Sequence, residues 1–405
     1  MISRLFLSFL VFAAVPCPTW SSSAESGDEG VCSEQDGSCS TAGGDPASSG
    51  SSCGCGALKR ADFVKDGVKL SEDKAGSHEL RSSTGETDEE AGIIYLDGGS
   101  FIMGLIPEDE KDPTVVFSDG EGPPHKETVG PFGLGVFEVS NRRFAIFVEQ
   151  TGYVTESETY GWSFGVEAFI SPEVNATITQ QVDAAPWWLP VERADWRHPN
   201  GPDTRIHDLM DHPVTQVSLK DAEAFCSWSR QGGRLPTEVE WEFAARGGKK
   251  SRRYPWGNTI LTGAHKNTHR MNIWQSELDV HLLKDGRVRN LYGHKQALQL
   301  VKEYYSSLNT AEDGYNATAP VDAFGPQNPY GFHNMVGNVW EWTSTNWAGA
   351  SDPNTMVKKG GSFLCNPATC NRFRCSARMM FTGDSAASNV GFRCAYTGKG
   401  SQSGR

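Results

Sequence analysis

From Arg252 to its end, the chain consists largely of glycine, asparagine, proline and aromatic residues, with only short apolar stretches between them. Short apolar pieces separated by turn residues do not support long helices or the alternating strands and helices of a doubly wound sheet. No repeat with a period of about 20–50 residues is present, which argues against solenoids and propellers. The pattern predicts an irregular, loop-rich α+β single domain with short strands, held together by its 12 tryptophans.

Three helices are expected before that region, in segments 140–152, 218–230 and 237–247. Each segment starts at a serine or threonine whose side-chain oxygen can cap the first N–H groups of a helix. The last two carry an acidic residue three positions later, the pattern of a capping box. The apolar segments 93–96 and 101–104, with Asp-Gly-Gly-Ser between them, predict the start of a β-hairpin.

The two ends of the chain differ from its middle. A basic residue followed by an apolar run too short to span a bilayer indicates a secretory signal. The next segment is rich in Ser, Gly, Asp and Glu and has too few apolar residues to fold by itself. We therefore expect a signal peptide at 1–23, a disordered tail at 24–91, a folded domain at 92–397 with a surface insertion at 277–311, and a disordered C-terminus at 398–405.

Charge and absent motifs argue against several functions. A net charge of −13 disfavours nucleic acid or an anionic membrane as a partner. The sequence contains no P-loop, no nucleophile elbow and no His-Glu-x-x-His segment, so nucleotide-binding and common hydrolase functions have no support. No Lys-Asp-Glu-Leu type of retrieval address stands at the C-terminus. Sequons at Asn175 and Asn316 are typical of surface glycosylation in a secreted protein.

The folded part contains an odd number of cysteines, so at least one thiol is left over unless it pairs with the tail. Cys365 and Cys370 enclose four residues and could close a disulfide or clamp one soft metal ion. Zinc is disfavoured because the spacing is not Cys-x-x-Cys and no histidine lies between Cys365 and Cys394. Two sulfurs without nitrogen or carboxylate partners suit Cu(I), and a plain structural pair is the alternative. The five cysteines are Cys226, Cys365, Cys370, Cys375 and Cys394.

The tail carries four further cysteines: Cys32, Cys39, Cys53 and Cys55. Cys53-Gly-Cys55 is too tight for an easy bridge within the segment. Two interpretations stay open, namely exchange with the thiols of another protein and two local disulfides.

Two loop regions combine amides, carboxylates and backbone carbonyls in the way that Ca²⁺ prefers. One runs from Asn334 to Glu341, and the other joins residues 272–273 to residues 313–315. The alternative is that these polar residues satisfy the backbone of their own turns.

Seven segments follow one another along the chain in a characteristic order. They are Ala184-Ala-Pro-Trp-Trp-Leu-Pro190, Asp195-Trp-Arg-His-Pro199, Gly233-Arg-Leu-Pro-Thr-Glu-Val-Glu-Trp-Glu242, Tyr254-Pro-Trp-Gly-Asn258, Asn334-Met-Val-Gly-Asn-Val-Trp-Glu-Trp342, Lys359-Gly-Gly-Ser362 and Ser388-Asn-Val-Gly-Phe-Arg-Cys394. Together these segments resemble the formylglycine-generating enzyme family, whose members are also called sulfatase-modifying factors. The resemblance covers about residues 92–397. The related iron sulfoxide synthases need a His-x-x-x-His-x-Glu signature that this chain lacks, and the inactive paralogue lacks the cysteine pair.

The resemblance implies a fold, a compartment and a reaction. The fold would be a variant of the C-type-lectin topology. The protein would be an enzyme of the endoplasmic reticulum lumen, with a partly secreted pool left open. It would use O₂ and Cu(I) to oxidise the cysteine of a Cys-x-Pro-x-Arg segment in unfolded sulfatases to Cα-formylglycine.

The resemblance also implies roles for individual residues. Cys365 and Cys370 would hold Cu(I), Ser362 and Trp340 would line the oxygen pocket, and Asn389 and Arg378 would face the substrate peptide. Structural calcium would bind at one site through Asn272, Ile273, Asp313 and Tyr315, and at a second site through Asn334, Gly337, Val339 and Glu341.

The remaining cysteines resemble family positions as well. Cys226 and Cys394 resemble a family disulfide. Cys375 resembles a cysteine whose usual partner falls at Ala245 here, so it should be a free, buried thiol unless it pairs with the tail. The pair at 53–55 resembles one that links to thiol-dependent lumenal oxidoreductases, which would replace the missing retrieval address.

The largest departure from the family lies between the two active cysteines. Most members carry His-x-Ser-Tyr there, whereas this chain has Asn366-Pro-Ala-Thr369, which removes an imidazole and stiffens the loop at Pro367. Two alternatives to a copper oxidase therefore stay open. One is a non-catalytic, sulfatase-binding regulator, and the other is a lectin-like module in which the cysteine pair is a staple.

Overall fold

The computed structural model describes residues 58–63, 92–112, 115–230, 232–262, 268–276, 309–367 and 370–397. All of them belong to one unit of the chain, Pro46–Arg405. The signal peptide, the four tail cysteines, the C-terminus and almost all of the insertion lie outside the described residues. Within the described part of the chain, no helix is long and apolar enough to cross a membrane.

The three expected helices form where their caps stand. Helix α1 (Asn141–Thr151) begins at Ser140, whose hydroxyl accepts the N–H of Arg143 at 3.4 Å. Helices α4 (Leu219–Ser229) and α5 (Glu238–Arg246) both begin with capping boxes. The short helices and 3₁₀ turns are η3 (Arg60–Phe63), η4 (Asp109–Lys111), η5 (Phe117–Asp119), α2 (Glu156–Tyr160), η6 (Glu167–Phe169), α3 (Pro172–Asn175) and η7 (His207–Leu209).

The expected hairpin between 93–96 and 101–104 is wrong. Strand β1 (Ile93–Leu96) pairs with β4 (Phe132–Gly135), and β2 (Gly99–Met103) pairs with β3 (His125–Val129). The cause is the bend at Gly98, where φ is 78° and a Cβ atom would lie 2.2 Å from the carbonyl oxygen of Val129. The chain therefore bends there without reversing, and both strands pair with residues 125–135.

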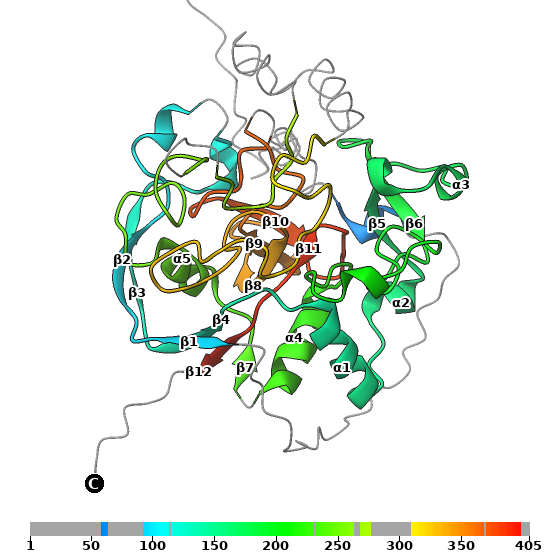
Figure 1. Cartoon of the computed structure of the whole chain (residues 1–405), viewed down its shortest axis with the longest axis horizontal. Coiled ribbons are helices and arrows are strands. Elements are labelled where there is room, and N and C mark those ends of the chain that lie inside the picture. The colour runs from blue at the N-terminus through cyan, green and yellow to red at the C-terminus, as the bar shows by residue number, and fades with distance from the viewer. Residues whose placement is uncertain are drawn as a thin grey trace, which may run out of the picture. The chain divides into compact units, whose positions relative to one another are not determined.

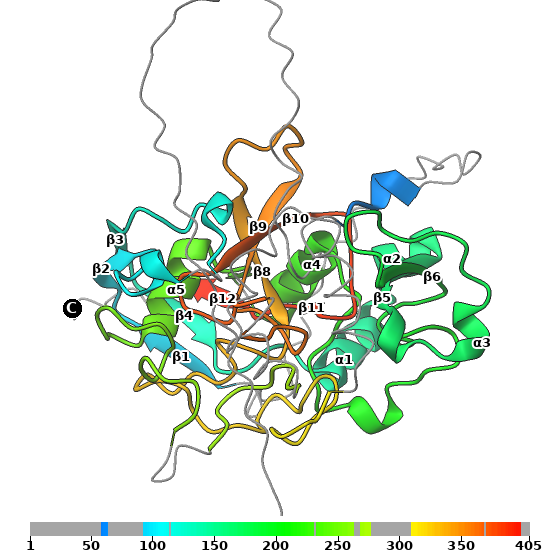
Figure 2. The same cartoon turned by 90° about the horizontal axis from the view of Figure 1, so that it is seen from above.

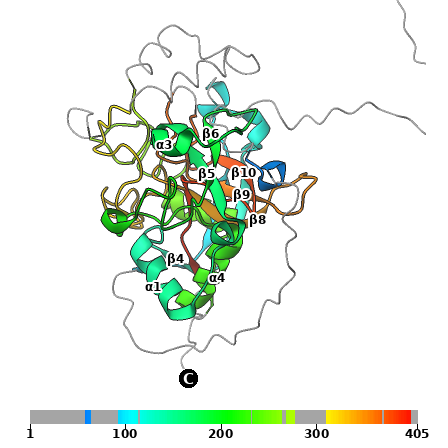
Figure 3. The same ribbon diagram turned by 90° about the vertical axis from the view of Figure 1, so that its right-hand side faces the viewer.

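The remaining strands build the frame of the molecule. They are β5 (Trp162–Val166), β6 (Trp188–Glu192), β7 (Gly233–Arg234), β8 (Trp340–Asn346), β9 (Thr355–Lys359), β10 (Arg378–Thr382), β11 (Val390–Gly391) and β12 (Ala395–Thr397). One sheet has the order β1-β4-β12-β7, and the central sheet has the order β10-β9-β8-β11. Helix α5 lies on one side of this central sheet, and α1 and α4 lie on the other (Figure 1, Figure 2). Figure 3 shows the β5–β6 ribbon together with α1 and α4.

An aromatic-rich core joins these elements, which confirms the expected loop-rich α+β fold. Two indole N–H groups in this core have polar partners. Trp241 donates to Glu341 at 2.8 Å, and Trp342 donates to the carbonyl oxygen of Val217 at 3.1 Å. Among the described residues, the buried tryptophans are Trp187, Trp188, Trp196, Trp241, Trp274, Trp340 and Trp342.

A short piece of the N-terminal tail is part of the fold, which differs from the expectation that residues 24–91 carry no folded structure. Leu58 is fully buried, and Arg60 is 1% exposed. The Arg60 guanidinium lies 4.2 Å from the ring centre of Tyr160 and 4.5 Å from that of Trp162. It also donates to the carbonyl oxygens of Asp384 and Trp162, both at 2.9 Å. These contacts hold the turn against β5, where it is drawn in blue (Figure 1).

We expect Arg60→Ala to lower the free energy of unfolding by about 2 kcal/mol, because it removes a desolvated cation–π contact and two hydrogen bonds. Urea denaturation of the full chain measures this loss. The control is Lys59→Ala, since Lys59 is exposed, and its effect should stay within about 0.5 kcal/mol. Equal effects of the two substitutions would show that Arg60 does not anchor the segment.

Candidate active site and cation sites

The turn after β9 positions Ser362. Gly360 and Gly361 have φ angles of 97° and 73°, and a Cβ atom on Gly361 would lie 2.9 Å from the carbonyl oxygen of Arg372. Only glycine combines this backbone conformation with so close an approach. The Lys-Gly-Gly-Ser motif therefore brings Ser362 from the end of the central sheet into the interior.

The two candidate catalytic cysteines follow this turn. Their Sγ atoms lie 3.0 Å apart, whereas a disulfide bond measures about 2.05 Å, so the pair is not a disulfide in this structure. Cys365 and Cys370 are 1% and 0% exposed. Asn366 lies in the loop between the two cysteines. It is buried, and its carbonyl oxygen accepts the N–H of Cys370 at 3.2 Å. Residues 368–369 lie outside the described residues.

The donor set at this pair fits a soft ion. Among the described residues, no group of three or more His, Cys, Asp or Glu side chains could hold a metal. A metal at this position would therefore depend on two protein sulfurs, a ligand set that suits Cu(I).

Two further candidate residues adjoin the cysteines. The amide of Asn389 donates to the hydroxyl of Ser362 at 2.9 Å, and the backbone N–H of Ser362 lies 3.4 Å from the Sγ of Cys365. The backbone N–H of Trp340 donates to the carbonyl oxygen of Asn389 at 2.9 Å. The structure thus brings Ser362, Asn389 and Cys365 together and attaches Trp340 to them through the backbone.

Arg378 has its contacts elsewhere. Its guanidinium donates to both carboxylate oxygens of Glu238 at 2.8 Å, and it lies over the ring of Trp347 at 4.6 Å. The Arg378 side chain remains 16% exposed. These contacts connect it to the start of α5 and not to the cysteine pair.

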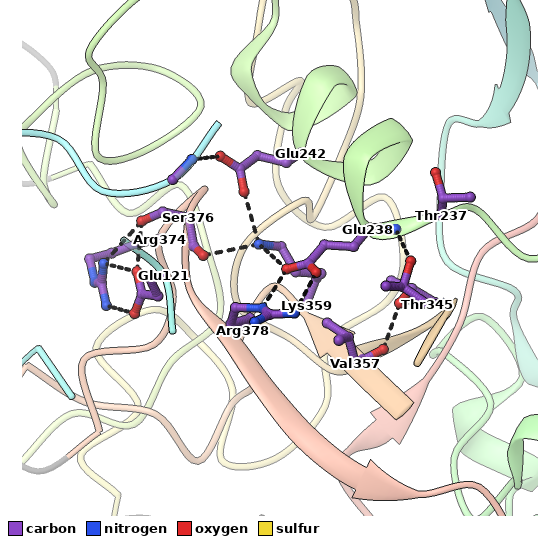
Figure 4. Close-up of polar contacts among 12 residues, drawn as sticks. Glu121, Thr237, Glu238, Glu242, Thr345, Val357, Lys359, Arg374, Ser376 and Arg378 are labelled. Carbon is purple, nitrogen blue, oxygen red and sulfur yellow. Dashed lines mark hydrogen bonds and ion pairs between the residues drawn. The ribbon is translucent and has the colours of Figure 1, made fainter. Parts of the chain in front are cut away.

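Figure 4 shows buried ion pairs along the segment that follows Cys370. Arg374 donates to the two carboxylate oxygens of Glu121 at 2.6 and 2.7 Å. Lys359 lies 3.0 Å from Glu242 and also donates to the carbonyl oxygen of Ser376. Burial would raise the pKa of Glu242, but Lys359 and Arg246 hold it below its ordinary value.

Sequence reasoning missed this network. The available signal was composition, since acidic residues gather in 109–121 and arginines in 372–378. Glu121 and Ser376, which share a 2.8 Å hydrogen bond, stand 255 positions apart. No local pattern predicts a pairing over that separation.

The first predicted calcium loop comes together. The carboxylate of Asp313 accepts the N–H groups of Ile273 and Tyr315, both at 3.0 Å. Burial raises the pKa of Asp313. The Oδ1 atom of Asn272 is buried and has no hydrogen-bond partner among the described residues. An orphaned amide oxygen beside a carboxylate and backbone carbonyls fits an oxygen-binding cation.

The second predicted calcium loop also offers an orphaned oxygen, at Oδ1 of Asn334. Gly337 and Val339 could contribute only backbone carbonyl oxygens. Glu341, however, accepts two hydrogen bonds from Arg393, at 2.6 and 2.7 Å, besides the one from Trp241. Its carboxylate is therefore already engaged by a guanidinium.

Glu138 is a carboxylate at this loop that sequence reasoning did not single out. It is 3% exposed and accepts the amide N–H groups of Asn334 and Asn338. Burial raises its pKa to about 8, while Arg393 opposes the shift, and a nearby cation would favour the ionised form. Its position in the apolar stretch Phe137-Glu138-Val139 was the available signal of a buried acid.

The remaining site predictions have direct structural counterparts. Cys226 and Cys394 form a disulfide, as the resemblance implied. Cys375 is a free, buried cysteine, and burial raises the pKa of its thiol to about 12. Of the two sequon asparagines, Asn175 is half-buried at the end of α3, and Asn316 is exposed.

Comparison with known proteins identifies relatives of similar length. Residues 79–397 match the sulfatase-modifying factor enzyme 1-like domain family. The formylglycine-generating enzyme of Mus musculus is 40% identical over 376 residues, which covers 86% of this chain and 87% of the mouse protein. The formylglycine-generating enzyme of Bos taurus is 43% identical over 315 residues, which covers 75% of this chain and 74% of the bovine protein. The inactive Cα-formylglycine-generating enzyme 2 of Bos taurus is 40% identical over 305 residues, which covers 75% of this chain and 87% of that protein.

The fold and the site define a loop-rich α+β domain built around a buried, closely spaced pair of cysteine sulfurs. The chain belongs to the sulfatase-modifying factor enzyme 1-like family, as its motifs led us to expect.

Proposed function

We propose that this chain is a catalytic member of its family, which converts the cysteine of a Cys-x-Pro-x-Arg segment in unfolded sulfatases to Cα-formylglycine with O₂. The observation that carries the proposal is the pair Cys365 and Cys370, whose sulfurs are 3.0 Å apart, unbonded to each other and buried beside Ser362. Relatives named formylglycine-generating enzymes, 40% and 43% identical, support it.

Cys365 and Cys370 would hold Cu(I), because two soft sulfurs suit that ion. Bound Cu(I) would supply the redox chemistry with O₂. The conversion removes two electrons from the substrate cysteine, whose sulfur leaves as hydrogen sulfide when water supplies the carbonyl oxygen. O₂ is reduced to water by these two electrons and by two more from a thiol reductant, which becomes a disulfide. The Ser362 hydroxyl, fixed by Asn389, would line the oxygen pocket. Trp340 would line it too, and its Nε1 has no hydrogen-bond partner among the described residues.

The substrate peptide would lie against Asn389 and Arg378. The Glu238 carboxylate holds the Arg378 guanidinium in one orientation, so Arg378 would present a preformed surface to the peptide. Ca²⁺ at the two loops would fix the backbone and take no part in the redox chemistry.

The cellular setting is also proposed from the family. The enzyme would work in the endoplasmic reticulum lumen, with glycans on Asn175 and Asn316. The Cys53–Cys55 pair would connect it to thiol-dependent lumenal oxidoreductases. Such a setting agrees with the Cys226–Cys394 disulfide, because disulfides persist in oxidising compartments.

A sulfatase-binding regulator without activity is the second candidate. The observation that favours it is the loop at 366–369, which lacks the histidine of most family members. The retained cysteine pair argues against it.

Turnover on a synthetic Cys-x-Pro-x-Arg peptide tests the proposal. The full chain is loaded with Cu(I) and supplied with a thiol reductant, and the peptide is followed in air by the mass loss on aldehyde formation. A peptide with serine in place of its cysteine and an oxygen-free reaction are the controls. Conversion of the cysteine peptide in air, with no conversion in either control, would support the oxidase. A folded, copper-loaded protein that leaves the peptide unchanged would exclude this reaction and favour the regulator.

A further inference from the structure

The site that holds Arg60 is built from aromatic rings and carbonyl oxygens. The guanidinium lies 4.2 Å from the ring centre of Tyr160 and 4.5 Å from that of Trp162, and it donates to the carbonyl oxygens of Trp162 and Asp384. The backbone N–H of Arg60 donates to the hydroxyl of Ser385 at 3.1 Å. We call Tyr160, Trp162, Asp384 and Ser385 the arginine receptor. Its rings and carbonyl oxygens suit any guanidinium group, whether it comes from this chain or from another.

The receptor holds Arg60 less firmly than the core holds its own arginines. Arg374 and Arg393 each donate to both oxygens of a buried carboxylate, at 2.6 and 2.7 Å. By contrast, no carboxylate oxygen of a described residue accepts a hydrogen bond from Arg60, and its Nη2 has no partner among these residues. Separating a buried charge from a paired carboxylate is costly. Arg60 avoids that cost when it leaves its site, so its place is exchangeable.

The receptor lies near the surface. Tyr160, Trp162 and Asp384 are half-buried, whereas the Arg60 that fills the receptor is 1% exposed. The described segment that carries Arg60 is short, at residues 58–63, and belongs to neither of the two main sheets. Such a segment can open locally while the rest of the molecule stays folded. A peptide can therefore reach the receptor once the segment has left it.

Residues 385–389 connect the receptor to the cysteine pair. Asn389, at the far end of this stretch, donates to the hydroxyl of Ser362, whose N–H lies 3.4 Å from the Sγ of Cys365. Four positions separate Ser385 from Asn389, so their Cα atoms are at most about 14 Å apart. The cysteine and the arginine of Cys-x-Pro-x-Arg are also four positions apart. A peptide with its cysteine at the sulfur pair can thus place its arginine in the receptor.

We propose that residues 58–63 are a built-in competitor of the substrate, in which Arg60 fills the receptor that otherwise takes the substrate arginine. The inference rests on the proposed function, which supplies the peptide motif. The sequence of the segment is similar to that motif, because Cys55, which lies outside the described residues, stands five positions before Arg60. A substrate binds only the fraction of molecules in which the segment has left, and its apparent affinity is lowered by that fraction.

Peptide binding without turnover provides the test. A labelled Ser-x-Pro-x-Arg peptide, which has no thiol to oxidise, is titrated with the copper-loaded full chain and followed by fluorescence anisotropy. Arg60→Ala removes the competitor, so we expect it to bind this peptide about 10-fold more tightly or better. A Ser-x-Pro-x-Ala peptide should gain nothing from the substitution, since it has no group for the receptor. Lys59→Ala, the matched control, should leave both affinities unchanged.

Hydrogen–deuterium exchange of the unaltered chain gives a second measurement, which decides the matter even if Arg60→Ala fails to fold. Saturation with Ser-x-Pro-x-Arg should speed the exchange of residues 58–63, because the bond from the Arg60 N–H to Ser385 is lost. Saturation with Ser-x-Pro-x-Ala should not.

Three results would overturn the proposal while leaving the oxidase intact. They are an Arg60→Ala variant that binds the arginine peptide no more tightly, an equal gain for both peptides, and unchanged exchange of residues 58–63 at saturation. Absence of peptide binding by every form of the protein would overturn the substrate of the proposed function, and this inference with it.

Discussion

Replacing Cys370 with serine is expected to reduce aldehyde formation to the level of the enzyme-free reaction while the protein stays folded. Serine is nearly the same size, but its hydroxyl is a hard oxygen that Cu(I) does not favour. One sulfur alone leaves the clamp incomplete, so Cys365→Ser should have the same effect. Peptide mass spectrometry measures the loss, and competition with a Cu(I) chelator should show that stoichiometric copper binding disappears as well.

The matched control is Cys375→Ser. Cys375 is also fully buried, and it lies five positions further along the chain, but its thiol is held protonated by burial and its sulfur is not in the 3.0 Å contact. This variant should keep its activity and bind copper. Substantial turnover by Cys370→Ser would contradict the two-sulfur clamp, and so would loss of copper from Cys375→Ser.

Replacing Arg374 with methionine is expected to cost about 3–5 kcal/mol of unfolding free energy, because it leaves the Glu121 carboxylate buried without its cation. Both side chains are buried, at 0% and 1% exposure, and two short hydrogen bonds join them. The double variant Glu121→Leu/Arg374→Met should lose much less than the sum of the two single losses, since a buried pair can often be exchanged for apolar residues. Denaturant unfolding of all four proteins gives the coupling energy.

An exposed pair supplies the comparison for this cycle. Arg142 and Asp211 lie 2.9 Å apart, but their side chains are 46% and 67% exposed. Breaking that pair with Arg142→Met should cost no more than about 1 kcal/mol. If Arg374→Met cost as little, the buried network of Figure 4 would have no special role in holding the segment after Cys370.

Local features of the sequence were sufficient for part of the fold. Ser140, Ser218 and Thr237 marked the starts of the three main helices, because a cap and its partner N–H stand only three positions apart. Reasoning from neighbouring residues also gave one wrong prediction, at residues 93–104. Two adjacent apolar segments suggested a hairpin, but both strands found their partners at 125–135.

Motifs and family resemblance carried the cysteine assignments further than local rules could. The Cys226–Cys394 disulfide spans 168 positions, and no spacing rule predicts such a pair. The open Cys365–Cys370 pair, by contrast, was visible as two thiols on one loop. The burial of this pair depends on the glycine turn before Ser362. The close contact between Gly361 and Arg372 in that turn exists only in the folded chain.

By itself, the sequence determined the helix starts, the loop-rich character and the two sulfurs, since all of these follow from short-range hydrogen bonding, composition and chemistry. Only the tertiary structure decided that Arg60 is buried against β5, that Arg374 is paired with Glu121, and that Glu138 is hydrogen-bonded to Asn334 and Asn338. A charged side chain is stable in the interior only when distant segments supply its partners. Those partners are set by how the whole chain packs and not by the neighbours of the residue in sequence.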